Sequence, residues 1–330
     1  MKDDYKNSNK KIGIILSNLG TPDSPTKKDL KKYLNQFLMD KRVIDLPRVF
    51  WLPILKLIIL NIRPKRSAKL YKAIWTQHGS PLMVFSKKIL KKLSEKFNDN
   101  ITLVMGMRYG SPSIKGAMNI LQKENISKIL VFPLYPQAGS PTTSSTFDAI
   151  ANYLAKIPWT PDLRFISGYH DNKDYVKALV NSINKSFKDH GIPDKLIFSF
   201  HGMPKRYLEK GDPYYCFCQK TARLTAEKLD LKEEFYEVAF QSRFGSEKWL
   251  EPYIDKILIN EAEVGTKYIQ VISPGFSVDC LETLEEISIQ YRKIFLKNGG
   301  EKFHYIPCLN DSEDQINMIE SIINDTIQNW

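Results

Sequence analysis

The sequence predicts an α/β protein with two similar lobes, each built on a parallel sheet flanked by helices. Two observations support this prediction. Eight short apolar runs recur along the 330 residues, four in each half, and longer segments with helical periodicity separate them. Parallel strands that are buried on both faces form continuous apolar runs, and helical crossovers connect them. The length also suits about two domains.

The apolar runs give the expected strands in chain order. Each run is short enough for a strand and is bounded by turn-forming or polar residues. The four runs of the first half are residues 12–19, 101–107, 129–134 and 163–166, and those of the second half are 196–200, 236–240, 268–272 and 303–306. Because open parallel sheets bind ligands at the carboxyl ends of their strands, we expect the chemistry just after these runs.

The segments between the strands show apolar residues at helical spacing. We expect helices over residues 27–38, 85–97, 113–123, 143–156, 173–190, 221–229, 252–263, 278–297 and 312–328. The sequence shows no long flexible linker, and we expect the joint between the two lobes near residues 168–171, before the helix at 173–190. We therefore predict a first lobe over residues 10–168 and a second lobe over residues 169–310.

Composition excludes several classes of protein. Hydrophobic residues make up 42% of the chain and charged residues 26%, which excludes a disordered chain. Four cysteines are too few for a disulfide-dense secreted scaffold. The first residues are polar and lack the apolar core of a signal peptide, so we expect a cytoplasmic protein. Apolar runs long enough to span a bilayer, about 18 residues, do not occur.

The net charge of +11 is concentrated in one segment. Residues 41–72 contain nine lysines and arginines and a single acid, Asp45. Such a patch attracts acidic lipid headgroups, carboxylate-bearing substrates or nucleic acid, although a solvated face is the plainer interpretation. Nucleic acid is disfavoured, because the cations alternate with aliphatic side chains more than with stacking aromatic ones.

An apolar stretch at residues 49–62, which we call the lip, lies inside this basic segment. Pro53 and Lys56 interrupt it, and it is too short to span a bilayer. Two interpretations remain open. The lip is a buried helix pair, or it is an exposed apolar surface with basic edges that covers a flat ligand or rests on a membrane. On the second interpretation we expect Leu55 and Ile59 to govern access of that ligand.

His201 is the most suggestive of the five histidines. It ends an apolar run and is followed by Gly202, so it lies where a parallel strand opens into a cleft. Its pKa suits proton transfer or metal ligation, although a lone histidine is often structural. Acids follow another strand: Asp279, Glu282 and Glu286 are spaced to share one helix face. This stripe is either a solvated face or a route for a cation or protons.

Other signals are weak or absent. Cys216 and Cys218 are separated by one residue, which does not match the spacing of zinc ligand pairs, and Cys280 and Cys308 are isolated. Glycine-rich phosphate loops are missing, which argues against a nucleotide-dependent enzyme. Two loops after strands, 107–112 and 133–145, are rich in hydroxyls and aromatics and include an arginine. They are either turns with helix caps or a source of donors for ligand carboxylates.

Motifs in consistent order along nearly the whole chain resemble the ferrochelatase family. They are Ser17-Asn18-Leu19-Gly20-Thr21-Pro22, Gly79-Ser80-Pro81-Leu82, Met107-Arg108-Tyr109-Gly110, Leu134-Tyr135-Pro136-Gln137, Phe200-His201-Gly202-Met203-Pro204, Phe240-Gln241-Ser242-Arg243-Phe244-Gly245 and Pro274-Gly275-Phe276 with Asp279-Cys280-Leu281-Glu282-Thr283-Leu284. The sequences of these motifs are similar to those of the Gram-negative bacterial branch of the family, which uses protoporphyrin.

The resemblance implies a chelatase fold of two Rossmann-like lobes, with the C-terminal helix at 311–330 packing back on the first. It implies insertion of Fe²⁺ into protoporphyrin IX with release of two protons, the terminal step of haem biosynthesis. It also assigns roles. These are His201, Glu282 and Glu286 as catalytic residues, His201 and Glu282 as transient metal ligands, and Arg108, Tyr109, Ser140 and Arg66 as substrate-binding residues.

The chain departs from relatives that hold a [2Fe–2S] cluster. Ser140 stands where those relatives have a cysteine ligand, and the chain has no cysteine-bearing extension after Trp330. We therefore expect no cluster and no tightly bound cofactor, with Fe²⁺ as a substrate. Cys280 stands where some relatives have a histidine that relays protons.

The expected partners are protoporphyrin IX and Fe²⁺, with peripheral contact at the cytoplasmic face of the inner membrane and no nucleic acid. We expect a monomer or a weak dimer. Two rival functions remain: a chelatase that loads cobalt or nickel into a more polar tetrapyrrole, and a two-lobe haem binder without activity. The first needs more basic and histidine residues in its pocket, and the second would leave the porphyrin unchanged.

Overall fold

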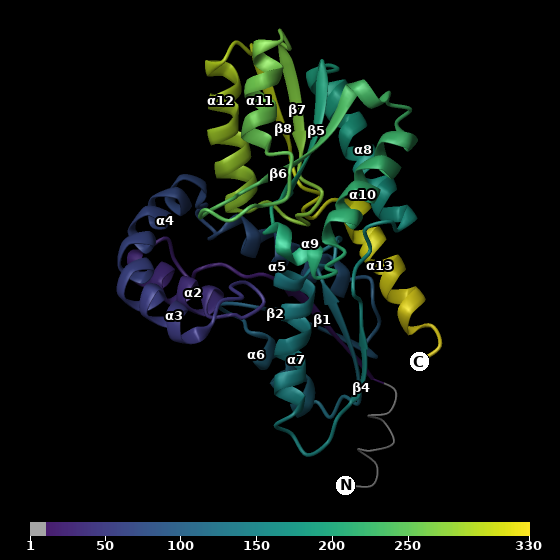
Figure 1. Ribbon diagram of the computed structural model, residues 1–330. Coiled ribbons are helices and arrows are strands. Elements are labelled where there is room, and N and C mark those ends of the chain that lie inside the picture. Colours follow the sequence, from purple (N-terminus) through teal and green to yellow (C-terminus); the bar gives the residue numbers. More distant parts are fainter. Residues whose placement is uncertain (1–10) are drawn as a thin grey trace. The chain divides into compact units, whose positions relative to one another are not determined.

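The computed structural model describes residues 11–330 and contains two four-stranded parallel sheets flanked by helices (Figure 1). The strand order is β2-β1-β3-β4 in the first sheet and β6-β5-β7-β8 in the second. Every strand pair of both sheets is parallel. The predicted α/β class with two similar parallel sheets is confirmed.

All eight predicted strands form, with ends that differ by at most one residue from the apolar runs. They are β1 (Ile12–Asn18), β2 (Ile101–Met107), β3 (Lys128–Pro133), β4 (Asp162–Phe165), β5 (Lys195–His201), β6 (Tyr236–Gln241), β7 (Tyr268–Ile272) and β8 (Lys302–Ile306). The central strands are buried along almost their whole length, which is why their sequences are continuous apolar runs.

The chain divides into two compact units. The first contains residues up to Tyr135, 140–168 and 319–330, and the second contains 136–139 and 169–318. The units and the predicted lobes change over at the same place, between Gly168 and Tyr169. They differ at residues 136–139, which belong to the second unit, and at the C-terminus, where the chain returns to the first unit at Ile319 instead of residue 311.

In the first unit, helices cover the sheet and extend beyond it. They are α2 (Lys27–Leu38), α3 (Arg48–Pro53), the π-helical η1 (Ile54–Ile59), α4 (Leu60–Ile74), α5 (Pro81–Ser94), α6 (Ile114–Lys123), the π-helical η2 (Ser140–Ser144) and α7 (Ser145–Leu154). One face of the sheet packs against α6 and α7, with Ile15 and Val131 of the strands meeting Leu121 and Ile150 of the helices.

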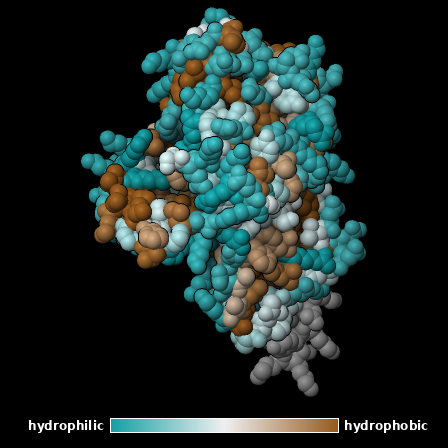
Figure 2. All heavy atoms as spheres, in the orientation of Figure 1, coloured by the Kyte–Doolittle hydropathy of each residue, from teal (hydrophilic) through white to brown (hydrophobic). Residues whose placement is uncertain are grey.

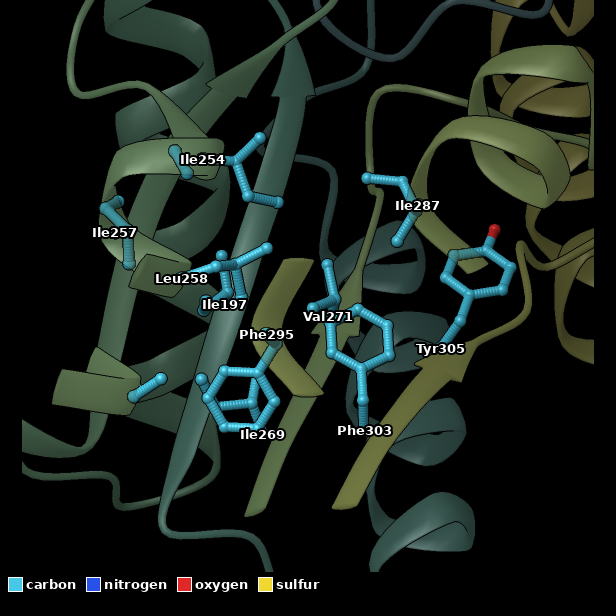
Figure 3. Packing of buried hydrophobic residues seen from close by; sticks show 12 residues of the cluster. Ile197, Ile254, Ile257, Leu258, Ile269, Val271, Ile287, Phe295, Phe303 and Tyr305 are labelled. Atoms are coloured by element: carbon cyan, nitrogen blue, oxygen red, sulfur yellow. The ribbon is translucent and has the colours of Figure 1, made fainter. Parts of the chain in front are cut away.

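In the second unit, the elements are α8 (Lys173–His190), α9 (Lys205–Glu209), α10 (Tyr214–Lys228), the short η3 (Glu233–Phe235), α11 (Ile254–Glu263), the π-helical η4 (Glu282–Tyr291) and α12 (Arg292–Lys297). Figure 3 shows the buried cluster that joins the sheet to α11, η4 and α12. Ile197, Ile269 and Val271 of the strands pack with Leu258, Ile287 and Phe295 of these helices. This packing holds η4 against the sheet.

The last helix, α13 (Glu313–Ile327), runs from the second unit into the first. Within the first unit Glu320 forms an ion pair with Lys96 at 2.8 Å. Arg164 of β4 donates to the backbone oxygens of Thr326 and Asn329, and its guanidinium lies 4.7 Å from the centre of the Trp330 ring. The predicted return of the C-terminal helix to the first lobe is confirmed for its part from Ile319.

The lip combines features of both interpretations of its sequence. Its helices α3, η1 and α4 bury one face, where Trp51 and Leu55 pack with α2 and Tyr109. The opposite face is exposed; Leu57, for example, is 72% accessible. Figure 2 shows hydrophobic side chains gathered over this part of the first unit, and the exposed ones are Val49, Phe50, Ile54, Leu57, Ile58 and Ile62.

The expectation that Leu55 and Ile59 govern ligand access is therefore wrong. Leu55 is fully buried, and Ile59 is partly buried against the same cluster. A single helical face holds the apolar residues that pack inward, and helical rotation places Leu57 and Ile58 on the other side. Within residues 11–330, none of the helices combines the length and the apolar character needed to cross a bilayer.

Some helix starts differ from the prediction; α10, for example, begins at Tyr214 and not at residue 221. Ser80 caps α5 by accepting a hydrogen bond from the Met83 N–H at 3.3 Å, so the helix starts at Pro81 and not at residue 85. The helix predicted over 278–297 starts only at Glu282 and runs first as a π-helix. That late start matters for the acidic residues described next.

Candidate active site

His201 ends β5 at the carboxyl edge of the second sheet, as the sequence predicts. Its half-buried ring places Nδ1 2.6 Å from the backbone oxygen of Gly202. A carbonyl oxygen only accepts hydrogen bonds, so Nδ1 carries the proton of the neutral ring. The other ring nitrogen, Nε2, then keeps its lone pair for a proton or a metal ion.

A close approach between strands explains the glycine after His201. The Gly202 N–H donates to the Gln241 oxygen of β6 at 2.7 Å. A Cβ atom at position 202 would lie 2.7 Å from that oxygen and 3.1 Å from the Trp249 ring. A larger residue at position 202 would push the ends of β5 and β6 apart and would displace His201. Glycine is therefore part of the positioning of His201.

The acidic residues follow β7, the other neighbour of β5 in the sheet. Glu282 is the first residue of the π-helical η4, and Glu286 lies on its next turn. The Glu282 side chain is partly exposed. It lies beside the buried Cys280 thiol, whose pKa is raised well above its ordinary value by burial and then by the Glu282 charge. Glu282 thus begins the helix that follows β7, a strand that neighbours β5.

The Glu286 carboxylate is surrounded by donors from β6 and η4. Oε1 accepts from the Ser242 N–H at 2.9 Å and the Tyr291 hydroxyl at 2.8 Å. Oε2 accepts from the Ser242 hydroxyl at 2.5 Å and from Gln241 Nε2 at 3.3 Å. Burial, and then the Glu286 charge, raise the pKa of Tyr291, so this phenol stays a donor at neutral pH. Glu286 is held firmly, whereas Glu282 is less constrained.

Asp279 does not join the acidic stripe, so that prediction is wrong. It precedes the first turn of η4 and is almost fully buried. Its carboxylate accepts from the Tyr305 hydroxyl at 2.7 Å, from Thr283 Oγ1 at 3.0 Å and from Asn310 Nδ2 at 2.6 Å. These contacts tie the segment before η4 to the loop after β8, and they replace the helix that the spacing suggested.

In the first unit, Arg108 and Tyr109 follow β2 and share one partner, Asp40. Asp40 Oδ2 forms an ion pair with the Arg108 guanidinium and accepts from the Tyr109 hydroxyl at 2.8 Å and from the Ser145 hydroxyl at 2.6 Å. Burial opposes the charge on Asp40, but the hydrogen bonds from Ser145 and the Arg42 N–H, with the Arg108 charge, lower its pKa. The backbone of Gly20 lies close to the backbone oxygen of Tyr109, and a Cβ atom at position 20 would overlap that oxygen. Glycine also adopts the φ of +102° at this position without strain.

The remaining predicted substrate residues lie outside this network. Ser140 is the first residue of η2, and Arg66 is exposed on α4. Tyr109 is almost fully buried and Arg108 is partly buried. Because both side chains contact the Asp40 carboxylate, Asp40 orients them. The roles of Arg108, Tyr109, Ser140 and Arg66 in binding a substrate stay predictions.

Within the second unit, the structure brings His201, Glu282 and Glu286 to one edge of one sheet. It also adds residues to which the sequence argument gave no role, namely Gln241, Ser242 and Tyr291 around Glu286, although Gln241 and Ser242 stand in one of the motifs quoted for the family resemblance. The signal available for the first two was their place directly after the β6 run, the same criterion that selected His201. Over the described part of the chain, no cluster of three or more His, Cys, Asp or Glu side chains is arranged to hold a metal ion.

Comparison with known proteins adds a family match over nearly the whole chain. Residues 11–327 match the family model described as Ferrochelatase. A Ferrochelatase of Pseudoalteromonas atlantica is 48% identical over 97% of this chain and 90% of its own length. One from Nitrosococcus oceani is 48% identical over 97% and 88%, and Ferrochelatase 2 of Shewanella oneidensis is 48% identical over 95% and 97%.

Solved structures support the fold. SirB from Bacillus subtilis with Fe³⁺ superposes with a TM-score of 0.58 at 10% identity, covering 96% of this chain and 95% of that one. The sirohydrochlorin chelatase SirB in complex with cobalt gives 0.58 at 11% identity, over 97% and 96%. At such low identity the likeness concerns the two-sheet architecture, which these chains share.

Proposed function

This chain belongs to the ferrochelatase family, and we propose that its porphyrin is protoporphyrin IX and that His201, Glu282 and Glu286 carry its chemistry. Members of this family insert Fe²⁺ into a porphyrin in haem synthesis. Insertion exchanges two pyrrole protons for one divalent metal ion, so the site needs bases for two protons and weak ligands for a metal in transit.

The observation that carries the assignment is the hydrogen bond of the His201 ring. Nδ1 donates to the Gly202 oxygen, which leaves Nε2 as a base or metal ligand at the sheet edge. Glu282 supplies a second base from the element after the neighbouring strand β7. An imidazole and one carboxylate are too few donors to hold Fe²⁺ permanently, which suits a metal that must leave for the macrocycle.

The first unit would contribute the binding of the porphyrin. We propose that Arg108, Tyr109, Ser140 and Arg66 lie along its binding surface, with the Asp40 network keeping Arg108 in place. The exposed face of the lip would cover the macrocycle or rest on the cytoplasmic membrane surface, and its basic edge would meet propionates or anionic headgroups. A peripheral cytoplasmic enzyme follows from this proposal.

We propose further that the protein holds no [2Fe–2S] cluster, since Ser140 replaces one family ligand. Iron and acid-labile sulfide in anaerobically purified protein test this. Substoichiometric amounts of both are expected, and one cluster per chain would overturn the proposal.

An anaerobic insertion assay tests the substrate. Fe²⁺ is supplied with protoporphyrin IX or with coproporphyrin III, and the metalloporphyrin absorbance is followed. We expect a higher kcat/KM with protoporphyrin IX. A preference for coproporphyrin III would overturn the substrate assignment, and binding without any metalloporphyrin would point to a haem binder. Co²⁺ or Ni²⁺ with sirohydrochlorin, run in parallel, tests the rival chelatase activity.

A further inference from the structure

Gln241 touches both elements that carry the proposed catalytic residues. It ends β6 and lies opposite His201 in the register of β5 and β6. Its backbone oxygen accepts from the Gly202 N–H at 2.7 Å, directly after His201. Its side-chain Nε2 donates to the backbone oxygen of Glu282 at 2.9 Å and to Glu286 Oε2 at 3.3 Å. Gln241 therefore forms hydrogen bonds both to the segment at the end of β5 that carries His201 and to η4, which carries Glu282 and Glu286.

The orientation of the Gln241 amide is fixed by a third contact. The Ser199 hydroxyl, two residues before His201 on β5, donates to Gln241 Oε1 at 2.8 Å. Because that oxygen is occupied on the β5 side, the NH₂ group must face η4. Gln241 is 1% exposed, so water does not compete for these bonds. The amide is held in one position relative to both elements.

Ser242 extends the same contact. Its φ is +67°, in the left-handed region that residues other than glycine seldom adopt. In this conformation both its N–H and its hydroxyl reach the Glu286 carboxylate, at 2.9 and 2.5 Å. Strained backbone of this kind persists where the surrounding structure determines it and clusters at functional sites.

We propose that Gln241 and Ser242 are positioning residues that set the placement of Glu282 and Glu286 relative to His201. They act through these groups and do not touch the porphyrin or the metal. Insertion needs both bases within reach of one macrocycle, and small misplacements of catalytic groups are costly. The proposal rests on the proposed function, because the placement of Glu282 and Glu286 relative to His201 matters only if these side chains act on one substrate.

The chain offers a matched control for Gln241. Gln270 is a buried glutamine of β7 in the same sheet, and it accepts from Ser186 at 2.7 Å and donates to the Gly191 oxygen at 2.8 Å. It pairs with Leu196 at the far end of β5 from His201. Replacing either glutamine by methionine removes buried hydrogen bonds of the same kind, but only one of them bonds to the acidic helix.

The experiment compares Gln241→Met and Gln270→Met for Tm, kcat and KM in anaerobic insertion of Fe²⁺ into protoporphyrin IX. We expect similar losses of Tm in both. The kcat should fall at least tenfold in Gln241→Met, with little change in the porphyrin KM, and stay within twofold of the native value in Gln270→Met. A native-like kcat in Gln241→Met, or an equal loss in Gln270→Met, would overturn the proposal.

Ser242→Gly keeps the test decisive if Gln241→Met does not fold. Glycine removes the hydroxyl donor, keeps the N–H and relieves the positive φ. We expect an unchanged or higher Tm with a kcat reduced about threefold or more, and an unchanged kcat would contradict the proposal. If the native protein itself inserts no metal, the proposed function fails; a native enzyme with fully active variants refutes the positioning role alone.

Discussion

The single free ring nitrogen of His201 makes this residue the most sensitive point of the proposed chemistry. We predict that His201→Ala lowers metal insertion more than tenfold, a loss of at least about 1.4 kcal/mol of transition-state stabilisation. The ring is half-buried, and within residues 11–330 its side-chain hydrogen bond goes to the adjacent Gly202, so the Tm should change little. Turnover in an anaerobic assay is measured beside thermal unfolding. A variant with more than a tenth of native turnover would exclude an essential base at this position.

The two glutamates of η4 differ in how firmly they are held, and we predict that this difference separates their variants. Glu282→Gln should lower kcat more than Glu286→Gln, because Glu282 lies at the start of η4 and is the less constrained of the two carboxylates. Glu286→Gln should instead lower stability by roughly 1–3 kcal/mol, since an amide cannot accept from all four donors around it.

Turnover and urea unfolding of both glutamine variants check this prediction. A larger loss of turnover at position 286, with no loss of stability there, would reverse the assignment of the two roles.

The strand β8 carries a histidine that resists protonation, and this gives the second unit a pH dependence. His304 stacks on His190 with ring centres 3.8 Å apart. Burial, followed by the charges of His190 and Lys302, lowers the pKa of His304 from 6.5 to about 4. Between these pH values the unfolded chain binds this proton and the folded chain does not, so stability falls as the pH falls from 6.5 to 4.

We predict that His304→Phe, which keeps a ring against His190, flattens this dependence. Because the side chain is partly exposed and solvent screens its charge, we expect only about 1 kcal/mol of the pH effect to come from it. Urea unfolding at pH 7, 5.5 and 4.5 measures the slope for both proteins. An identical slope in the variant would show that other groups are responsible.

The lip has one buried face and one exposed face, and variants on the two faces should behave differently. Leu57→Ser and Ile58→Ser change exposed side chains, so we predict a raised KM for protoporphyrin with an unchanged Tm and unchanged Fe²⁺ dependence. Leu55→Ser changes a fully buried side chain and should cost roughly 2–5 kcal/mol of stability. The two Michaelis constants and a melting curve decide the outcome. A porphyrin KM that is unaffected by both exposed changes would remove the lip from substrate binding.

At the scale of the whole molecule, we predict that the uneven distribution of charge favours contact with an anionic membrane surface. We predict that Lys65→Glu with Arg66→Glu weakens binding to vesicles that contain anionic phospholipid, at about 1 kcal/mol for each cation near the surface. Both side chains are exposed on α4 beside the apolar face of the lip. Binding by the native protein should also fade with added salt, since the Debye length shrinks from about 10 Å at 0.1 M to about 3 Å at 1 M.

Lys228→Glu with Lys232→Glu is the matched control, because it makes the same change of net charge at exposed positions of the second unit. Vesicle co-sedimentation compares the two double variants. Equal weakening by both would mean that net charge, and not the lip, controls the contact.

Local sequence patterns determined much of this protein. The central strands are buried on both faces and have no polar side, and the apolar runs of the edge strands were also enough to locate all eight strands. The same runs placed His201 at a strand end, because a strand stops where its apolar pattern stops. The helix that begins at Lys27 could be located too, since Thr26 caps it and its apolar residues recur at helical spacing. These features depend on neighbours close in sequence.

Tertiary structure decided the rest, because the relevant partners are far apart in sequence. Asp279 fits a helical stripe by spacing, but its buried bonds to Tyr305 and Asn310 keep it outside the helix. Arg108 has the right chemistry to bind an anion, yet Asp40, which lies 68 residues earlier, already holds it. A periodic pattern cannot report such long-range hydrogen bonds, which form only where folding brings the donors and the acceptor to one place and removes the water between them.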